Sequence, residues 1–116
     1  MSRERIFKAL TSLGLSESDA RVYILLALKG PTKTGNIVND LKMSRQQIHR
    51  SLKYLQDKGI VFADSTSRGV FSALAFEKAL KLLIDTEKTK NQILQDTKEA
   101  LLSDFKTAAK RNSANS

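Results

Sequence analysis

The 116-residue chain has no cysteine, no tryptophan, one proline and one histidine. Without cysteine there is no disulfide framework, no thiolate metal site and no cysteine nucleophile, and one histidine cannot build a transition-metal cluster. We therefore expect no metal and no cofactor. The chain also lacks a Walker or Rossmann glycine pattern and a recognisable Ser, His and Asp set, so the sequence does not predict an enzyme.

Long apolar runs are missing as well. The longest, Val22 to Leu28, is about a third of the roughly 20 residues that cross a bilayer, and the N-terminus lacks a signal-peptide core. We expect a soluble intracellular protein. The length allows one domain of ordinary size with an appended helix.

Acidic residues are in the minority, with 12 Asp and Glu against 20 Lys and Arg and a formal charge of +8. Residues 1–75 hold 12 of the basic and 6 of the acidic residues. This excess favours a polyanionic partner such as nucleic acid.

Apolar residues spaced by three and four predict helices over residues 3–13, 17–29, 35–41 and 45–58. Ser16, Thr34 and Ser44 are the expected N-caps. The second of these helices is expected to bury four residues, Val22, Leu25, Leu26 and Leu28. Two β-prone runs, 60–63 and 70–74, flank a polar turn and predict a hairpin. Residues 76–110 contain neither Pro nor Gly and predict one long helix, with residues 111–116 frayed.

This order of elements predicts a mostly α fold: a winged helix-turn-helix with a two-stranded β-wing and a long C-terminal helix. We expect residues 1–75 to form the DNA-binding domain and residues 76–110 to form a dimerisation helix, followed by the tail at 111–116.

The helix after Ser44 carries the candidate base-reading residues. At 100° per residue, Ile48, Ser51, Leu52 and Leu55 share one side, whereas Gln46, Arg50, Lys53 and Asp57 point away from it. Arginine and glutamine suit base edges, lysine suits phosphate, and Arg45 lies at the helix N-terminus, where a phosphate is favoured. A polar face that is merely solvated is the competing interpretation.

Other polar residues extend the candidate set. Arg68, in the turn 64–69, suits the minor groove or a phosphate, although an ordinary hairpin turn explains it equally well. The single histidine, His49, is expected to face the groove or solvent rather than a metal. The expected DNA contacts are Thr32, Lys33, Thr34, Ser44, Arg45, Gln46, Gln47, His49, Arg50, Lys53 and Arg68.

Several segments carry a family likeness: Leu13-Gly14-Leu15, Ala20 to Tyr23, Gly30-Pro31-Thr32, Ser44 to Leu55, and Lys58 to Val61, with Phe71, Ala73, Glu77, Ala79 and Leu80 after them. Over about two-thirds of its length the chain resembles the TrmB-type winged-helix transcriptional regulators common in archaea, and more loosely the MarR-type regulators. The resemblance implies a dimer that binds promoter DNA with 44–58 as recognition helix. Full-length relatives carry a large C-terminal sugar-sensing domain after a coiled linker, and this chain ends at Ser116, so the resemblance does not carry a sugar response over to it. His49 stands where relatives often have tyrosine, which leaves the operator sequence open.

Two copies are expected, because one winged domain reads only half of a paired site. The expected dimerisation residues lie on the long helix: Leu80, Leu83, Leu94, Leu101 and Phe105. Glu87 and Lys90 interrupt this heptad seam, so parallel pairing, antiparallel pairing, a break near residues 85–86 and folding back onto the same domain all stay open.

The sequence therefore predicts a cytoplasmic, nucleoid-associated homodimer that regulates transcription by binding specific double-stranded DNA. The alternative is a winged-helix adaptor that docks on proteins through its long helix. RNA binding is disfavoured, because aromatic residues that stack on single strands are sparse.

Overall fold

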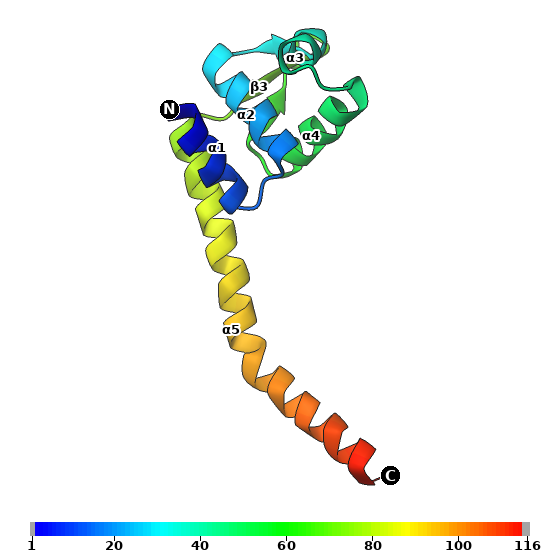
Figure 1. Ribbon diagram of the computed structural model, residues 1–116. Helices are drawn as coiled ribbons and strands as arrows, with labels where there is room; N and C mark the ends of the chain where they lie inside the picture. The colour runs from blue at the N-terminus through cyan, green and yellow to red at the C-terminus, as the bar shows by residue number, and fades with distance from the viewer. Residues whose placement is uncertain (1, 115–116) are drawn as a thin grey trace. The chain divides into compact units, whose positions relative to one another are not determined.

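The computed structural model describes residues 2–114 (Figure 1). Five helices and three short strands follow one another in the order α1 Ser2–Ser12, α2 Glu17–Lys29, β1 Thr32–Lys33, α3 Thr34–Leu41, α4 Arg45–Asp57, β2 Val61–Ala63, β3 Val70–Ala73 and α5 Phe76–Ala114. The helices, the hairpin and the long final helix lie where the sequence predicts them. The structure thus confirms a mostly α winged-helix architecture.

Two helices begin with reciprocal side-chain caps. The hydroxyl of Ser16 accepts from the Asp19 N–H at 3.0 Å, and the Ser16 N–H donates to the Asp19 carboxylate at 3.3 Å. Ser44 and Gln47 form the same arrangement at the start of α4. Each pair satisfies two N–H groups that a helix end otherwise leaves without partners. The two predicted N-caps, Ser16 and Ser44, are confirmed.

The start of α3 differs from the sequence-based expectation. Its N-cap position is Lys33, which makes no side-chain cap bond, and Thr34 is already the first helical residue. The Thr34 hydroxyl instead donates to the carbonyl of Gly69 at 3.2 Å. The predicted role of Thr34 as an N-cap is therefore wrong, because the extended backbone at the N-cap position belongs to Lys33 and Thr34 already lies within the helix.

The sheet has three antiparallel strands in the order β1-β3-β2. Strand β2 pairs with β3 in the predicted hairpin, with Val61 opposite Ala73. On the other edge of β3, the short strand β1 pairs Thr32 with Phe71 and Lys33 with Val70. Strand β1 was not expected, since two residues carry no periodic signal. It attaches the base of the wing to the start of α3.

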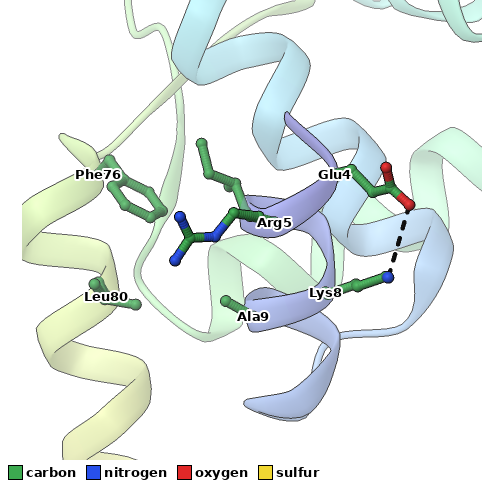
Figure 2. Close-up of a pocket in the computed structure, with 7 residues that line it drawn as sticks. Glu4, Arg5, Lys8, Ala9, Phe76 and Leu80 are labelled. Atoms are coloured by element: carbon green, nitrogen blue, oxygen red, sulfur yellow. Dashed lines mark ion pairs between the residues drawn. The ribbon is translucent and has the colours of Figure 1, made fainter. Parts of the chain in front are cut away.

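The first two turns of α5 pack on the winged domain. Ala79 is fully buried and Leu83 is 4% exposed, both within the same apolar core as α2 and α4. Figure 2 shows Phe76 and Leu80 of α5 facing α1 across a groove, into which the Arg5 guanidinium projects. The compact winged unit accordingly continues to Ile84, and a second unit begins at Asp85.

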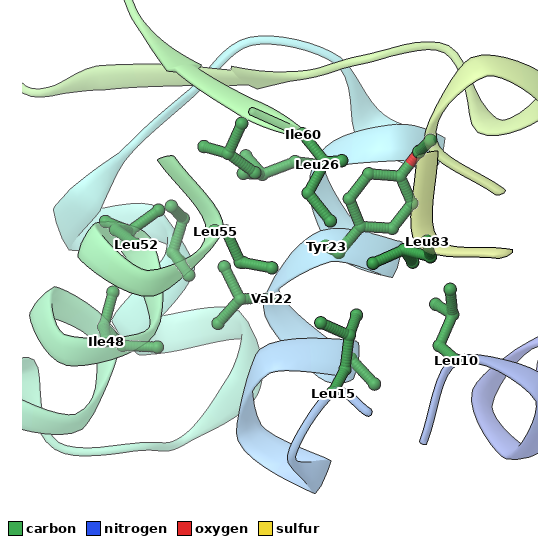
Figure 3. Packing of buried hydrophobic residues seen from close by; sticks show 14 of the residues in the cluster. Leu10, Leu15, Val22, Tyr23, Leu26, Ile48, Leu52, Leu55, Ile60 and Leu83 are labelled. Carbon is green, nitrogen blue, oxygen red and sulfur yellow. The ribbon is translucent and has the colours of Figure 1, made fainter. Parts of the chain in front are cut away.

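The core lies between α2, α4 and the sheet. Its fully buried large side chains include Tyr23, Leu26, Ile48, Leu55 and Ile60 (Figure 3). The inward stripe predicted for α4 is confirmed, as all four of its members are buried. In α2, Val22 and Leu26 are buried as predicted, Leu25 is half-buried, and Leu28 is 56% exposed. The prediction that Leu28 is buried is therefore wrong. Tyr23, which was not among the four predicted residues, is the large side chain that α2 places in the core.

Helix α5 continues to Ala114, four residues beyond its predicted end at Lys110. The rest of the predicted frayed tail, residues 115 and 116, lies outside the described residues. From Lys88 to Asn112 every side chain is exposed. No helix within residues 2–114 combines the length and apolar composition required to cross a membrane.

Candidate nucleic-acid interface

The exposed side of α4 carries the predicted DNA-reading residues. Gln46, His49, Arg50 and Lys53 are all exposed. Gln46, Arg50 and Lys53 lie on the side of the helix opposite the buried Ile48 stripe, and His49 lies on its flank. The helix is attached by its apolar side to α2 and the core, so its polar side is presented on a rigid element. This is the placement that a recognition helix requires.

The basic side chains of this surface are not paired with acidic side chains within the described residues. Within residues 2–114, Lys8 pairs with Glu4 and Lys29 pairs with Asp40 at 2.6 Å. Over the same residues, Arg45, Arg50, Lys53 and Arg68 form no ion pair with an acid. A cation that is not neutralised within the protein can approach a phosphate without first losing a partner.

Two of the predicted contacts, Ser44 and Gln47, serve the helix start. The side-chain oxygen of Gln47 accepts from both the Ser44 N–H and the Ser44 hydroxyl at 3.3 Å. Both side chains are exposed, so their place at the surface agrees with the prediction. Their hydrogen bonds, however, are committed to capping α4.

Arg45 reaches the neighbouring helix. Its guanidinium lies 4.0 Å from the position that a Cβ at Gly35 would occupy, over the first turn of α3. Lys33, two residues before Gly35, is exposed at the same helix end. The structure thus extends the cationic surface from the start of α4 to the start of α3.

Thr32 and Thr34 do not belong to this surface. They are 4% and 7% exposed, and their hydroxyls donate to the carbonyls of Gly30 at 2.8 Å and Gly69 at 3.2 Å. Both threonines face inward because β1 pairs with the wing, a contact that the local sequence does not reveal. We therefore correct the expectation that they contact phosphate, and of the three neighbouring residues retain Lys33 alone.

The wing turn is organised by Asp64. Its carboxylate accepts from the N–H and the hydroxyl of Thr66, both at 2.8 Å, and from the Ser67 N–H at 3.3 Å. The hydrogen bonds from Thr66 and Ser67 lower the pKa of Asp64. Arg68 is exposed in this turn, and Gly69 follows it with a positive φ of 79°.

A hollow of about 360 Å³, lined mainly by residues with polar side chains, lies beside α4. The start of α2 contributes Ser16, Ser18 and Asp19, and α4 contributes Arg50 and Tyr54 among others. Sequence reasoning missed Ser18 as a neighbour of Arg50, since only tertiary packing brings the start of α2 against α4. The capping motif at Ser16 locates the helix start but not its neighbour.

The predicted dimerisation residues fall into two groups. Leu83 lies in the core of its own domain, so its prediction as an interface residue is wrong. Leu80 is half-buried in the groove beside α1. In contrast, Leu94, Leu101 and Phe105 are 63%, 60% and 72% exposed. At 100° per residue these three lie within about 40° of one another on α5.

Solved structures share this fold. TrmBL2, an archaeal chromatin protein whose structure shows a novel mode of DNA binding, matches 89% of this chain with 19% identity and a TM-score of 0.73. This chain covers only 40% of that protein. The ST1889 protein of the thermoacidophilic archaeon Sulfolobus tokodaii matches 80% of this chain over 98% of its own, with 20% identity and a TM-score of 0.64.

A DNA complex is also among the similar structures. ZitR of Lactococcus lactis, in a mutant form bound to DNA, matches 86% of this chain over 76% of its own, with 18% identity and a TM-score of 0.50. At these identities the likeness establishes the winged-helix fold. The comparison with curated proteins gives no match.

A family model covers the winged domain itself. The model described as sugar-specific transcriptional regulator TrmB matches residues 10–77, more than half of the chain. The match begins in α1 and ends in the first turn of α5, so it includes α4 and the wing. The chain therefore belongs to the TrmB family of transcriptional regulators.

Proposed function

We propose that this protein regulates transcription by binding specific double-stranded DNA as a homodimer. The observation that carries the proposal is the outward side of α4, where Arg50 and Lys53 are exposed and have no acidic partner within residues 2–114. Family membership and the excess of basic residues support it.

The exposed polar residues of this surface have proposed roles of two kinds, base reading and phosphate contact. Arg50 and Gln46 face base edges in the major groove, where arginine matches guanine and glutamine matches adenine. Lys53 and Arg45 contact phosphates and set the register of α4 on the duplex. Lys33 adds a phosphate contact at the start of α3, and Arg68 is presented by the wing. His49 lies among these residues on the exposed side.

The second copy is proposed to dock on α5. Leu94, Leu101 and Phe105 form an exposed apolar stripe, which we call the α5 stripe. Burying such a stripe against its equivalent in a second chain removes apolar surface from water. Two winged domains are then available for paired half-sites.

The decisive experiment removes the two central cations. Arg50→Ala combined with Lys53→Ala is expected to weaken binding to a labelled duplex by about 10- to 100-fold, measured by fluorescence anisotropy. The matched control combines Lys88→Ala with Lys106→Ala, which removes the same charge from exposed positions of α5. Its affinity should stay close to that of the unmodified protein.

Two results would contradict the proposal. One is unchanged duplex binding by the Arg50 and Lys53 variant; the other is an equal loss of affinity in the control. Sequence specificity is tested separately by selecting bound fragments from genomic DNA at two salt concentrations. Fragments that share a motif at the higher salt support base readout, whereas fragments without one contradict it.

A further inference from the structure

The Gly69 carbonyl at the end of the wing turn accepts two hydrogen bonds from one residue. The Thr34 N–H donates to it at 3.0 Å, and the Thr34 hydroxyl donates to it at 3.2 Å. The two residues are 35 positions apart in sequence. Thr34 is 7% exposed, so this contact is shielded from water.

This contact extends the sheet to the edge of the wing turn. Strand β1 pairs Lys33 with Val70, and Thr34 continues the same line of contact to Gly69. On the other side of β3, the Asp64 N–H donates to the Val70 carbonyl at 2.8 Å. The chain returning from the turn is thus held along both edges.

Hydrogen bonds within the turn itself also hold its backbone. Asp64 accepts from Thr66 and Ser67, as described above, and the Val70 N–H donates to the Ser67 carbonyl at 3.2 Å. Arg68 stands between Ser67 and Gly69, both of which take part in these hydrogen bonds. The backbone on either side of Arg68 is therefore anchored while its side chain is exposed.

We propose that Thr34 is a positioning residue for the wing: its hydroxyl anchors Gly69 and thereby directs the Arg68 guanidinium towards DNA. An anchored turn does not lose its backbone freedom on binding, so the cost of ordering the wing is met during folding. This inference rests on the proposed function and assigns Thr34 a role through Arg68 rather than through its own contact with phosphate.

Thr34→Val removes the hydroxyl and keeps both the side-chain shape and the backbone N–H. The matched control is Thr32→Val, because Thr32 is equally buried and also donates its hydroxyl to a backbone carbonyl, but to that of Gly30. Thr34→Ser retains a hydroxyl and serves as the conservative variant. Thermal unfolding establishes that each protein is folded, and Thr34→Ala replaces Thr34→Val if the latter does not fold.

Binding is measured by anisotropy with a fluorescein-labelled mixed-sequence duplex of about 30 base pairs at low salt, which suits a phosphate or minor-groove contact. We expect Thr34→Val to weaken binding by up to about fivefold, because the turn loses a hydrogen bond that orders it before binding and must then be ordered on the DNA. Thr32→Val and Thr34→Ser should bind as the unmodified protein does. In an Arg68→Ala background, Thr34→Val should cause no further loss, because the cation that it directs is gone.

A second measurement tests the order of the wing backbone in the absence of DNA. Amide hydrogen exchange from Thr66 to Val70 should be faster in Thr34→Val than in Thr32→Val. The inference is overturned if Thr34→Val binds normally, or if it weakens binding equally with and without Arg68. An unmodified protein that binds no duplex refutes the proposed function itself, and with it this role of Thr34; normal binding by both the unmodified protein and Thr34→Val refutes the role alone.

Discussion

Tyr23→Phe tests how the core is attached to the start of α5. The Tyr23 ring is fully buried, and its hydroxyl donates to the Leu74 carbonyl at 2.6 Å, at the end of the wing hairpin. The substitution keeps the ring and removes only the donor. Near neutral pH we expect the free energy of unfolding to fall by about 1 kcal/mol, because the carbonyl of Leu74 loses its hydrogen bond.

The same substitution has a distinctive pH dependence. Burial raises the pKa of Tyr23 from its usual value of 10 to about 12. Because the folded-state pKa lies above the unfolded one, the contribution of the phenol is fully present below about pH 10 and is lost as the pH rises towards 12. At about pH 11 the unfolded phenol is mostly ionised and the folded one mostly protonated. The unmodified protein should therefore lose about 1.4 kcal/mol that Tyr23→Phe does not lose.

Urea unfolding of both proteins, followed by circular dichroism at about pH 8 and about pH 11, measures this difference. The other titrating groups are common to the two proteins, so their effects largely cancel. The unmodified protein should be the more stable at the lower pH, and at the higher pH its advantage should be lost or slightly reversed. The chain has two tyrosines, so the tyrosinate absorbance that Tyr23→Phe removes belongs to Tyr23. A stability gap that does not change with pH, or ionisation of Tyr23 near pH 10 in the folded protein, refutes the reasoning.

Three further predictions concern α4, α5 and the DNA. Ser44→Ala should lower the free energy of unfolding by about 1 kcal/mol, since the Gln47 N–H at the start of α4 loses its bond to the Ser44 hydroxyl; unchanged urea unfolding would contradict this. Leu94→Lys combined with Leu101→Lys should yield monomers in sedimentation velocity, whereas Ile93→Lys, on another side of α5, should not; dimers that persist would exclude the α5 stripe as the interface. The logarithm of the DNA association constant should fall steeply with the logarithm of salt concentration, with a slope reduced by about 1 per bound chain in Lys53→Ala; a flat slope would rule out phosphate contacts.

The exposure of the polar side of α4 could be predicted because it follows from the periodicity of a single helix. Four apolar or small residues on one side of α4 determine which side faces the core, and Arg50 and Lys53 are then exposed by geometry alone. The sequence predicts only part of the roles of Ser44 and Gln47. Their spacing indicates an N-cap, but it does not show that the Gln47 side-chain oxygen, which base reading would also need, accepts hydrogen bonds from Ser44.

The sequence by itself determined the helix starts at Ser16 and Ser44, the hairpin and the outward side of α4. These features depend on residues close together in sequence: a hydroxyl capping an N–H three residues on, the 100° step of a helix, or two strands joined by a short turn, with Val61 opposite Ala73. Tertiary structure alone decided that Thr34 bonds to Gly69, that Thr32 is buried where β1 pairs with β3, and that Leu83 joins the core of its own domain. Each of these depends on a segment more than 30 residues away or on a neighbouring helix, and local periodicity carries no information about which distant surface will cover a side chain.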